Sequence, residues 1–156
     1  ITEEAVSTVK SRVDEAVQKG AKILAGGEAD GSVYQATLLT HVSRDTEFAQ
    51  EETFGPVASI EIVADADEAV DRANDTVYGL SAGIITSDPD RGLTLAQRIQ
   101  AGIVHVNDQP GGDEPQMPFG GVKGSGFGRF GGTAAINEFT EIHWVTVQSG
   151  SHPFPF

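Results

Sequence analysis

Between residues 57 and 106 the chain alternates short apolar stretches with amphipathic ones, and this alternation constrains the fold more than any other feature. The apolar stretches 57–63, 81–86 and 103–106 have the length of strands, and the stretches between them place apolar residues at helical spacing. Strands and helices that alternate with short connections favour right-handed crossovers and a parallel sheet covered on both faces. We therefore predict the α/β class, with a three-layer α/β/α arrangement around a mainly parallel sheet.

Capping residues mark the ends of the predicted helices. Thr2 has the side chain of an N-cap, and Gly20 suits the position after a helix. The apolar residues between them recur at helical spacing: Val6, Val9, Val13, Ala16 and Val17. A second helix is predicted from about Asp67 to Val77, with Val77 on its inner face. A third helix starts at Asp88, because aspartate is a favoured N-cap and a proline follows it, and stops at Gly102.

The other predicted elements are short. Residues 22–25 and 34–42 have the composition of strands, and a polar surface loop through Gly31 separates them. Near the C-terminus we predict a helix over about residues 133–139 and an alternating strand from Ile142 to Val147. The tail that follows contains two prolines, which prevent either element from continuing.

Composition excludes several classes of protein. A chain of 156 residues fits one domain, and 38% hydrophobic with 21% charged residues is typical of water-soluble globular proteins. No apolar run is long enough to cross a bilayer, and no targeting signal is visible, so cytoplasmic is the default location. The net charge of -13 repels phosphate backbones and argues against nucleic acid as a partner. The absence of cysteine excludes disulfides and thiolate metal sites.

Five motifs follow one another in an order and spacing that resemble a single family. They are Glu51-Glu52-Thr53-Phe54-Gly55-Pro56-Val57, Asn74, Tyr78-Gly79-Leu80-Ser81-Ala82-Gly83, Ala101-Gly102-Ile103-Val104-His105-Val106-Asn107, and Pro118-Phe119-Gly120-Gly121-Val122-Lys123-Gly124-Ser125-Gly126-Phe127-Gly128-Arg129. This pattern is similar to that of the NAD(P)-dependent aldehyde dehydrogenases. The similarity covers the whole chain but only the C-terminal part of the much longer family protein.

The resemblance implies that the chain is a piece of an enzyme. The family's nucleophile is a cysteine upstream of this region, whereas this chain starts at Ile1 and contains no cysteine. We therefore expect it to be inactive by itself and to have the N-terminal remainder of the enzyme as its partner. On this interpretation residues 1–140 belong to the catalytic domain, and residues 141–156 form an oligomerisation strand and tail. In relatives that strand extends a sheet of the neighbouring subunit, which predicts a homo-oligomer joined through Ile142 to Val147.

Glu52 and Phe54 are the residues that the resemblance assigns to the cofactor, NAD or NADP. In the family the second acid of this motif binds the nicotinamide ribose, and the aromatic residue packs near the nicotinamide ring. An ionised carboxylate accepts two hydrogen bonds, so it suits vicinal hydroxyls, and a neighbouring ring would limit the freedom of the nicotinamide. The alternative is that Glu52 is a solvated turn residue and Phe54 a core residue. Glu51 is interpreted as a surface charge.

Phe119 resembles the aromatic residue that lines the family's substrate tunnel. A flat apolar wall is what the side chain of an aldehyde requires, although the residue type alone is equally consistent with a core position under a glycine turn. The loop 108–117 would border the substrate entrance. In detail this loop, the Trp144-Val145-Thr146-Val147 end and the tail resemble the branch that acts on aromatic aldehydes such as benzaldehyde, vanillin or salicylaldehyde.

Other patterns are not assigned a function. Residues 126–131 satisfy G-x-G-x-x-G but lack the strand before and the long helix after that a dinucleotide fingerprint needs, and residues 123–125 lack the glycine spacing of a phosphate loop. The histidines at 41, 105, 143 and 152 are too scattered for a metal site, and His105 is interpreted as packed and hydrogen-bonded. Asn107 could cap a strand end by bonding loop backbone. No residue is assigned as catalytic.

Two functions remain open from the sequence. The first is part of an oxidoreductase that oxidises an aldehyde, preferably an aromatic one, to the carboxylic acid with NAD or NADP. The second is a non-catalytic binding or assembly module derived from the same fold.

Overall fold

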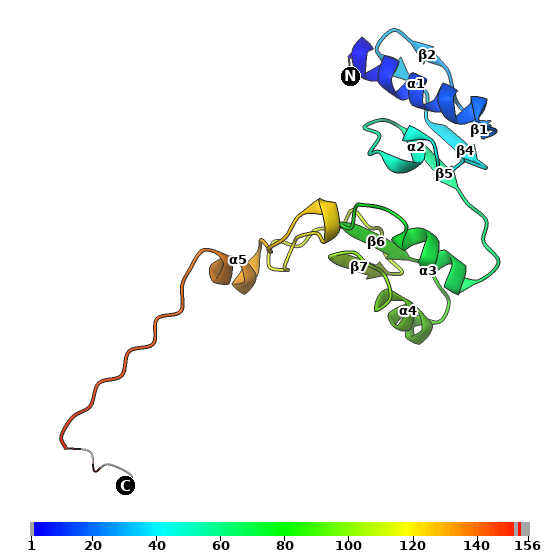
Figure 1. Cartoon of the computed structure of the whole chain (residues 1–156). Coiled ribbons are helices and arrows are strands. Elements are labelled where there is room, and N and C mark those ends of the chain that lie inside the picture. Colours follow the sequence, from blue (N-terminus) through cyan, green and yellow to red (C-terminus); the bar gives the residue numbers. More distant parts are fainter. Residues whose placement is uncertain (1, 152, 154–156) are drawn as a thin grey trace. The chain divides into compact units, whose positions relative to one another are not determined.

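The computed structural model describes residues 2–151 and 153 and divides into two compact units, Ile1–Val77 and Tyr78–Phe156 (Figure 1). The elements of the first unit are α1 (Glu3–Gln18), β1 (Lys22–Ala25), β2 (Ala29–Asp30), β3 (Val33–Tyr34), β4 (Thr37–Thr40), α2 (Glu47–Gln50), β5 (Val57–Ile60) and α3 (Ala66–Asn74). Those of the second unit are β6 (Ser81–Ile84), α4 (Pro89–Ala96), β7 (Ile103–Val106), the 3-10 helix η1 (Lys123–Ser125) and α5 (Gly132–Glu138). Within the described residues, none of the helices is long and apolar enough to cross a bilayer.

Helix α1 forms as predicted. The Thr2 side chain accepts a hydrogen bond from the Ala5 backbone at 3.1 Å, which confirms the N-cap, and the helix ends just before Gly20. Its apolar stripe packs on the first unit's own core through Val6, Val9, Val13 and Ala16. Val17 was expected in this stripe, but it is 40% exposed because it lies at the edge of the buried face.

A three-stranded sheet in the order β1-β4-β5 lies against α1. Strand β4 pairs antiparallel with β1 and parallel with β5, so that Thr37 lies opposite Val57 and Thr40 opposite Ile60. Leu39, in the middle of β4, is fully buried and belongs to the same cluster as the apolar residues of α1. The core of the first unit therefore lies between α1 and one face of this sheet.

Local differences from the sequence-based prediction occur where short polar segments are ordered by hydrogen bonds. The loop through Gly31 contains β2, which pairs with β3 in a two-residue antiparallel ladder. Helix α2 was not predicted, and Thr46 caps it. Helix α3 ends at Asn74, because the backbone leaves the helical conformation at Asp75, where ψ is 63°. Val77 lies beyond this end and is 61% exposed instead of buried.

The second unit contains a strand, a helix and a strand in the predicted order. Strands β6 and β7 are parallel, with Ser81 opposite Ile103 and Ile84 opposite Val106, and α4 connects them. Asp88 caps α4 by accepting from the Arg91 backbone at 3.0 Å, which confirms the predicted start. The helix ends at Ala96, earlier than the predicted stop at Gly102.

The structure is a mixed α/β fold with small sheets. The predicted parallel pairing is present in β4–β5 and in β6–β7, but β1–β4 is antiparallel. Strands β5 and β6, which the sequence places next to each other, belong to different units. A single, mainly parallel sheet covered on both faces therefore remains a prediction.

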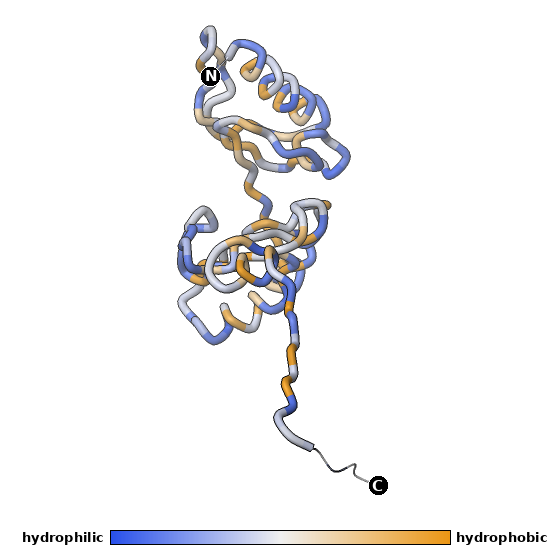
Figure 2. The backbone as a smooth tube through the Cα atoms, turned by 90° about the vertical axis from the view of Figure 1, so that its left-hand side faces the viewer, coloured by the Kyte–Doolittle hydropathy of each residue, from blue (hydrophilic) through white to orange (hydrophobic). Residues whose placement is uncertain are grey.

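The predicted strand from Ile142 to Val147 is not formed as a paired strand. This segment has no helix or strand, and its apolar residues Ile142, Trp144, Val145 and Val147 are 67 to 102% exposed. Figure 2 shows hydrophobic and hydrophilic residues alternating along the extended segment. A strand needs a neighbour for its backbone hydrogen bonds, and no described residue supplies one. Pairing with another subunit stays a prediction.

Candidate functional site

Residues 51–57 connect α2 to β5 and are tied down at both ends. The backbone N–H of Glu51 donates to the Glu47 carbonyl at 2.8 Å, which closes α2. At the other end, the Pro56 carbonyl accepts from the Thr37 backbone at 2.8 Å as β5 joins the sheet. Glu52 and the ring two residues later therefore lie on a short turn between two fixed elements.

Glu52 and Phe54 both face solvent in this chain. Phe54 is 79% exposed, so the alternative that it is a core residue does not hold here. Glu52 is also exposed, and no described residue bonds its carboxylate. Phe54 lines a cavity of about 270 Å³, together with residues of α1, of the β2–β3 region and of its own turn: Ala5, Val6, Val9, Ser32, Val33, Tyr34, Gly55 and Pro56.

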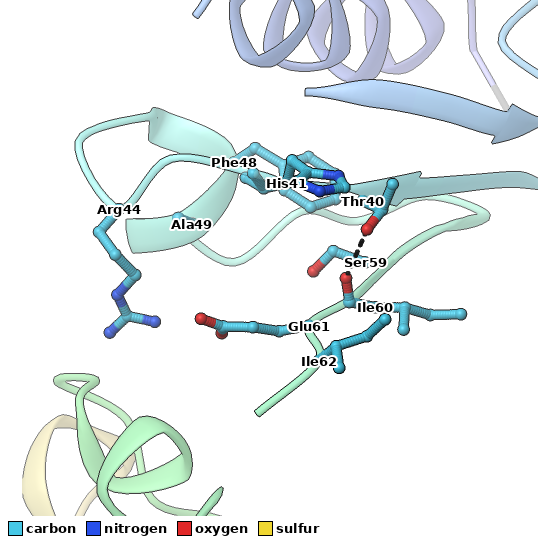
Figure 3. A pocket seen from close by; sticks show the side chains of 10 residues that line it. Thr40, His41, Arg44, Phe48, Ala49, Ser59, Ile60, Glu61 and Ile62 are labelled. Carbon is cyan, nitrogen blue, oxygen red and sulfur yellow. Dashed lines mark hydrogen bonds between the residues drawn. The ribbon is translucent and has the colours of Figure 1, made fainter. Parts of the chain in front are cut away.

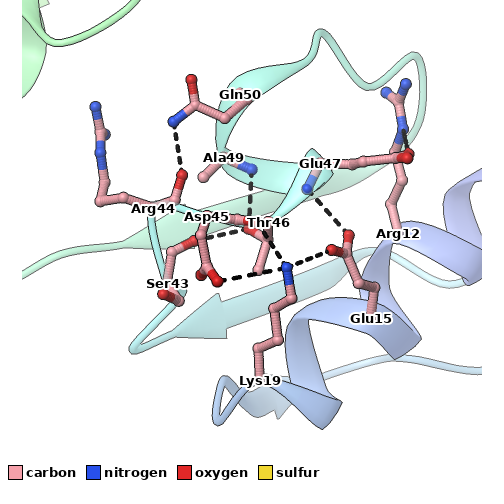
Figure 4. A network of polar contacts seen from close by, with 10 residues as sticks. All are labelled: Arg12, Glu15, Lys19, Ser43, Arg44, Asp45, Thr46, Glu47, Ala49 and Gln50. Carbon is pink, nitrogen blue, oxygen red and sulfur yellow. Dashed lines mark hydrogen bonds and ion pairs between the residues drawn. The ribbon is translucent and has the colours of Figure 1, made fainter.

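A polar network attaches the helix that precedes the turn to α1 (Figure 4). The Glu15 carboxylate accepts from the backbone N–H of Glu47 at 3.0 Å, at the start of α2, and lies 2.9 Å from the Lys19 ammonium. Lys19 also donates to the Asp45 carbonyl at 2.6 Å. Thr46, almost completely buried, accepts from the Ala49 backbone at 3.2 Å and donates to the Ser43 carbonyl at 2.7 Å. These bonds fix α2, and with it the first residue of the turn.

This network predicts a pH dependence of stability. Hydrogen bonds from the Lys19 side chain and from the Glu47 backbone hold the pKa of Glu15 below its usual value of 4.5. A carboxylate with a lowered pKa stabilises the fold above pH 4.5, and this contribution is lost as the pH falls through the folded-state pKa. Glu15→Gln should therefore be less stable than the parent chain at pH 7 and should lose less stability on acidification, as measured by urea unfolding from pH 7 downward.

The matched control for this variant is Glu28→Gln. The Glu28 carboxylate accepts from the neutral amide of Gln35 at 3.3 Å, so its removal breaks no contact with a cation. If the loss of unfolding free energy between pH 7 and acidic pH changes equally in both variants, the assignment of the pH dependence to Glu15 is wrong.

A second cavity of about 350 Å³ lies at the carboxyl ends of β4 and β5 (Figure 3). Open α/β sheets bind ligands at such ends, but the sequence analysis did not single out these residues. His41, which lines the cavity, has a positive φ of 56°. The charged groups here are already paired, Arg44 with Asp75, and Glu61 with Arg72 at 3.4 Å. We therefore assign this cavity no function.

Phe119 lies in the second unit beside a larger cavity. Its backbone N–H and C=O exchange hydrogen bonds with Phe130, both 2.8 Å long, and its side chain is 37% exposed, so it is not a buried core residue. The cavity is about 520 Å³. Apolar and acidic residues of β7 and of the following loop line it with Phe119: Ile103, Val104, Asp108, Asp113, Glu114 and Met117.

The glycine-rich block packs on the ends of β6 and β7. The Ser125 hydroxyl accepts from the Gly79 backbone at 3.0 Å, and the Val122 backbone donates to the Gly79 carbonyl at 2.9 Å. Gly126, Gly128 and Gly131 have positive φ, a conformation that glycine adopts without steric cost. The run is preceded by η1 and followed by the short α5, so it lacks the context of a dinucleotide fingerprint, as expected.

Asn107 has the structural role expected of it, whereas His105 has its expected role only in part. The Asn107 side-chain oxygen accepts from the Thr86 backbone at 2.8 Å, which confirms that it caps the strand end. His105 packs beside Gly112, but its buried Nε2 has no hydrogen-bond partner among the described residues. Among the described residues, no group of three or more His, Cys, Asp or Glu side chains is arranged so that it could hold a metal ion.

Comparison with known proteins gives these motifs a context. The model of the aldehyde dehydrogenase family matches residues 1–145. The chain belongs to the aldehyde dehydrogenase family. This confirms the resemblance inferred from the motifs.

Three relatives place the chain within the family. It is 47% identical to vanillin dehydrogenase of Pseudomonas fluorescens over 94% of this chain, and 43% identical to benzaldehyde dehydrogenase [NAD(+)] of Pseudomonas putida over 100%. The crystal structure of salicylaldehyde dehydrogenase from Pseudomonas putida G7, complexed with salicylaldehyde, superimposes with a TM-score of 0.89 at 40% identity and covers 99% of this chain. The chain spans only 30 to 32% of the length of these aldehyde dehydrogenases.

The candidate site residues fall in both units. Glu52 and Phe54 share one turn of the first unit, and Phe119 belongs to the second. Within the first unit the structure adds Arg12, to which the sequence analysis assigned no role. A lone arginine at the border of the apolar stripe of an amphipathic helix has no sequence signal that distinguishes it from a solvated surface charge.

Proposed function

We propose that this chain is the C-terminal part of the catalytic domain of an enzyme that oxidises an aromatic aldehyde to its carboxylic acid with NAD or NADP. The observation that carries the proposal is 43 to 47% identity, over nearly the whole chain, to dehydrogenases of vanillin and benzaldehyde. Residues 1–140 then belong to a three-layer α/β/α catalytic domain. Residues 141–156 then form the oligomerisation strand and tail, with Ile142 to Val147 pairing with a neighbouring subunit in a homo-oligomer.

Glu52 and Phe54 contact the nicotinamide end of the cofactor. The bound nicotinamide supplies the hydride acceptor. The Glu52 carboxylate accepts hydrogen bonds from the two hydroxyls of the adjoining ribose, and the Phe54 ring limits the orientations of the nicotinamide. Their exposure on a braced turn supports these roles, since neither group is engaged by a described residue of this chain that would have to be displaced.

Phe119 forms one wall of the substrate tunnel. The cavity of about 520 Å³ beside it is in the range of small-molecule sites, and the apolar part of its lining, Ile103, Val104, Met117 and Phe119, suits a benzene ring. The chain contains no cysteine, so the N-terminal remainder of the enzyme has to supply the thiolate that attacks the aldehyde.

This function predicts that the chain alone is inactive. The purified chain, incubated with benzaldehyde and NAD+, should produce no NADH, because it lacks a nucleophile. The complete enzyme that contains it should oxidise benzaldehyde, vanillin or salicylaldehyde under the same conditions. Sustained NADH formation by the chain alone would contradict its role as a dependent segment. A complete protein that oxidises none of these aldehydes with either cofactor would instead favour a non-catalytic module.

A further inference from the structure

Helix α1 supports the Glu52–Phe54 turn with a cation. One terminal nitrogen of Arg12, Nη1, donates to the Glu52 backbone carbonyl at 2.5 Å and to the Thr53 hydroxyl at 3.0 Å. The Arg12 side chain is only 18% exposed. These two bonds join residues 40 and 41 positions apart in the sequence. They fix the backbone of the residue whose carboxylate is proposed to bind the ribose.

The same face of α1 also meets the other end of the turn. Val9 lies three residues before Arg12, and residues at this spacing project from one side of a helix. A Cβ added at Gly55 would lie 2.5 Å from Val9 Cγ2, so the chain at Gly55 packs directly on this helix. Phe54 therefore lies between two points of support, Arg12 at Glu52 and Thr53, and Val9 at Gly55.

The surroundings of Arg12 make these bonds strong. Hydrogen bonds from a charged donor contribute more than neutral ones, and partial burial limits competition from water. The Arg12 Nε lies 3.7 Å from the Glu47 carboxylate, at the start of α2. Arg12 thus connects α1, the first turn of α2 and the residues that follow α2.

We propose that Arg12 is a positioning residue for the cofactor site. It contacts no cofactor itself, but it orients the turn so that the Glu52 carboxylate and the Phe54 ring are presented together. The inference rests on the cofactor roles proposed for Glu52 and Phe54. Because binding geometry is sensitive to displacements of about 1 Å, a more mobile turn should weaken cofactor binding more than it lowers the stability of the fold.

The test compares steady-state kinetics of variants in the complete enzyme. Arg12→Met keeps the aliphatic stem and removes the donors, so it should raise KM for NAD+ about tenfold, with kcat at saturating NAD+ nearly unchanged. Arg12→Lys keeps the charge, and its KM for NAD+ should lie between those of the parent enzyme and of Arg12→Met. The matched control, Lys10→Met, removes a cation of the same helix that pairs with Asp14 at 2.6 Å, and should leave KM unchanged.

Two further measurements separate positioning from a general structural role. AMP lacks the nicotinamide ribose, so its inhibition constant should be the same in Arg12→Met and the parent enzyme. Thr53→Val removes one acceptor of Arg12 at nearly constant volume and should raise KM for NAD+ in the same direction by a smaller factor. It also keeps the proposal testable if Arg12→Met does not fold.

Glu52→Gln is the reference variant that separates this inference from the proposed function. If Glu52→Gln raises KM for NAD+ while Arg12→Met and Thr53→Val behave like Lys10→Met, the positioning role is wrong and the cofactor site stands. If Glu52→Gln also has no effect, the proposed cofactor site itself is wrong, and the inference fails with it. If Arg12→Met raises the inhibition constant of AMP and the KM for NAD+ by the same factor, Arg12 has only a structural role and the inference is overturned.

Discussion

Replacing Gly102 with alanine should lower the free energy of unfolding of the second unit by about 3 kcal/mol, the upper end of the usual cost of overpacking. A Cβ at this position would lie 1.8 Å from the carbonyl oxygen of Gly120 and 3.0 Å from Cα of Gly121. Both are backbone atoms, so no side-chain rotation relieves the overlap. Gly102 also donates to the Gly79 carbonyl at 3.0 Å, immediately before β7, so the strand start has to move as well.

The control for this variant is Gly111→Ala. Gly111 has open space where its Cβ would be and lies in the loop after β7. Urea unfolding, monitored by circular dichroism, should show a large decrease in the free energy of unfolding for Gly102→Ala and a change within about 0.5 kcal/mol for Gly111→Ala. Equal shifts would show that the close approach of residues 102 and 120 does not limit stability. Since Phe119 precedes Gly120, the displaced backbone should also disturb the proposed substrate wall.

Glu52→Gln in the complete enzyme should raise KM for NAD+ between about 10-fold and 100-fold. A hydrogen bond to a charged group contributes about 1.5 to 3 kcal/mol, and each 1.4 kcal/mol corresponds to a factor of ten. Glutamine has nearly the shape of glutamate, so the variant removes the charge and one of the two acceptor oxygens while it keeps the turn intact. Initial rates over a range of NAD+ concentrations, at saturating benzaldehyde, measure this effect.

The neighbouring acid provides the control for Glu52. Glu51→Gln makes the same chemical change one residue earlier, at the end of α2, where the sequence assigns only a surface charge. It should change KM for NAD+ less than twofold, well below the effect expected at Glu52. If the two variants change KM equally, the carboxylate at position 52 has no special contact with the ribose.

Some helix starts and one strand could be predicted from neighbouring residues. The caps of α1 and α4, at Thr2 and Asp88, are local hydrogen bonds, and strand β7 matches its predicted range of 103–106. The end of α3 and the short α2 were not predicted. Helix α2 has only four residues, too few to show hydrophobic periodicity, and α3 ends three residues before its predicted end, an offset typical of helix boundaries inferred from sequence.

The sequence alone determined the family, because the order and spacing of the motifs around Glu52, Asn107 and Phe119 are properties of the linear chain. It also identified the residues proposed to meet cofactor and substrate. Only the tertiary structure showed that Arg12 supports the backbone at Glu52, since a bond between residues 40 positions apart depends on how α1 lies against the turn. The tertiary structure likewise left residues 142–147 unpaired, because a strand forms only where another backbone supplies its hydrogen bonds.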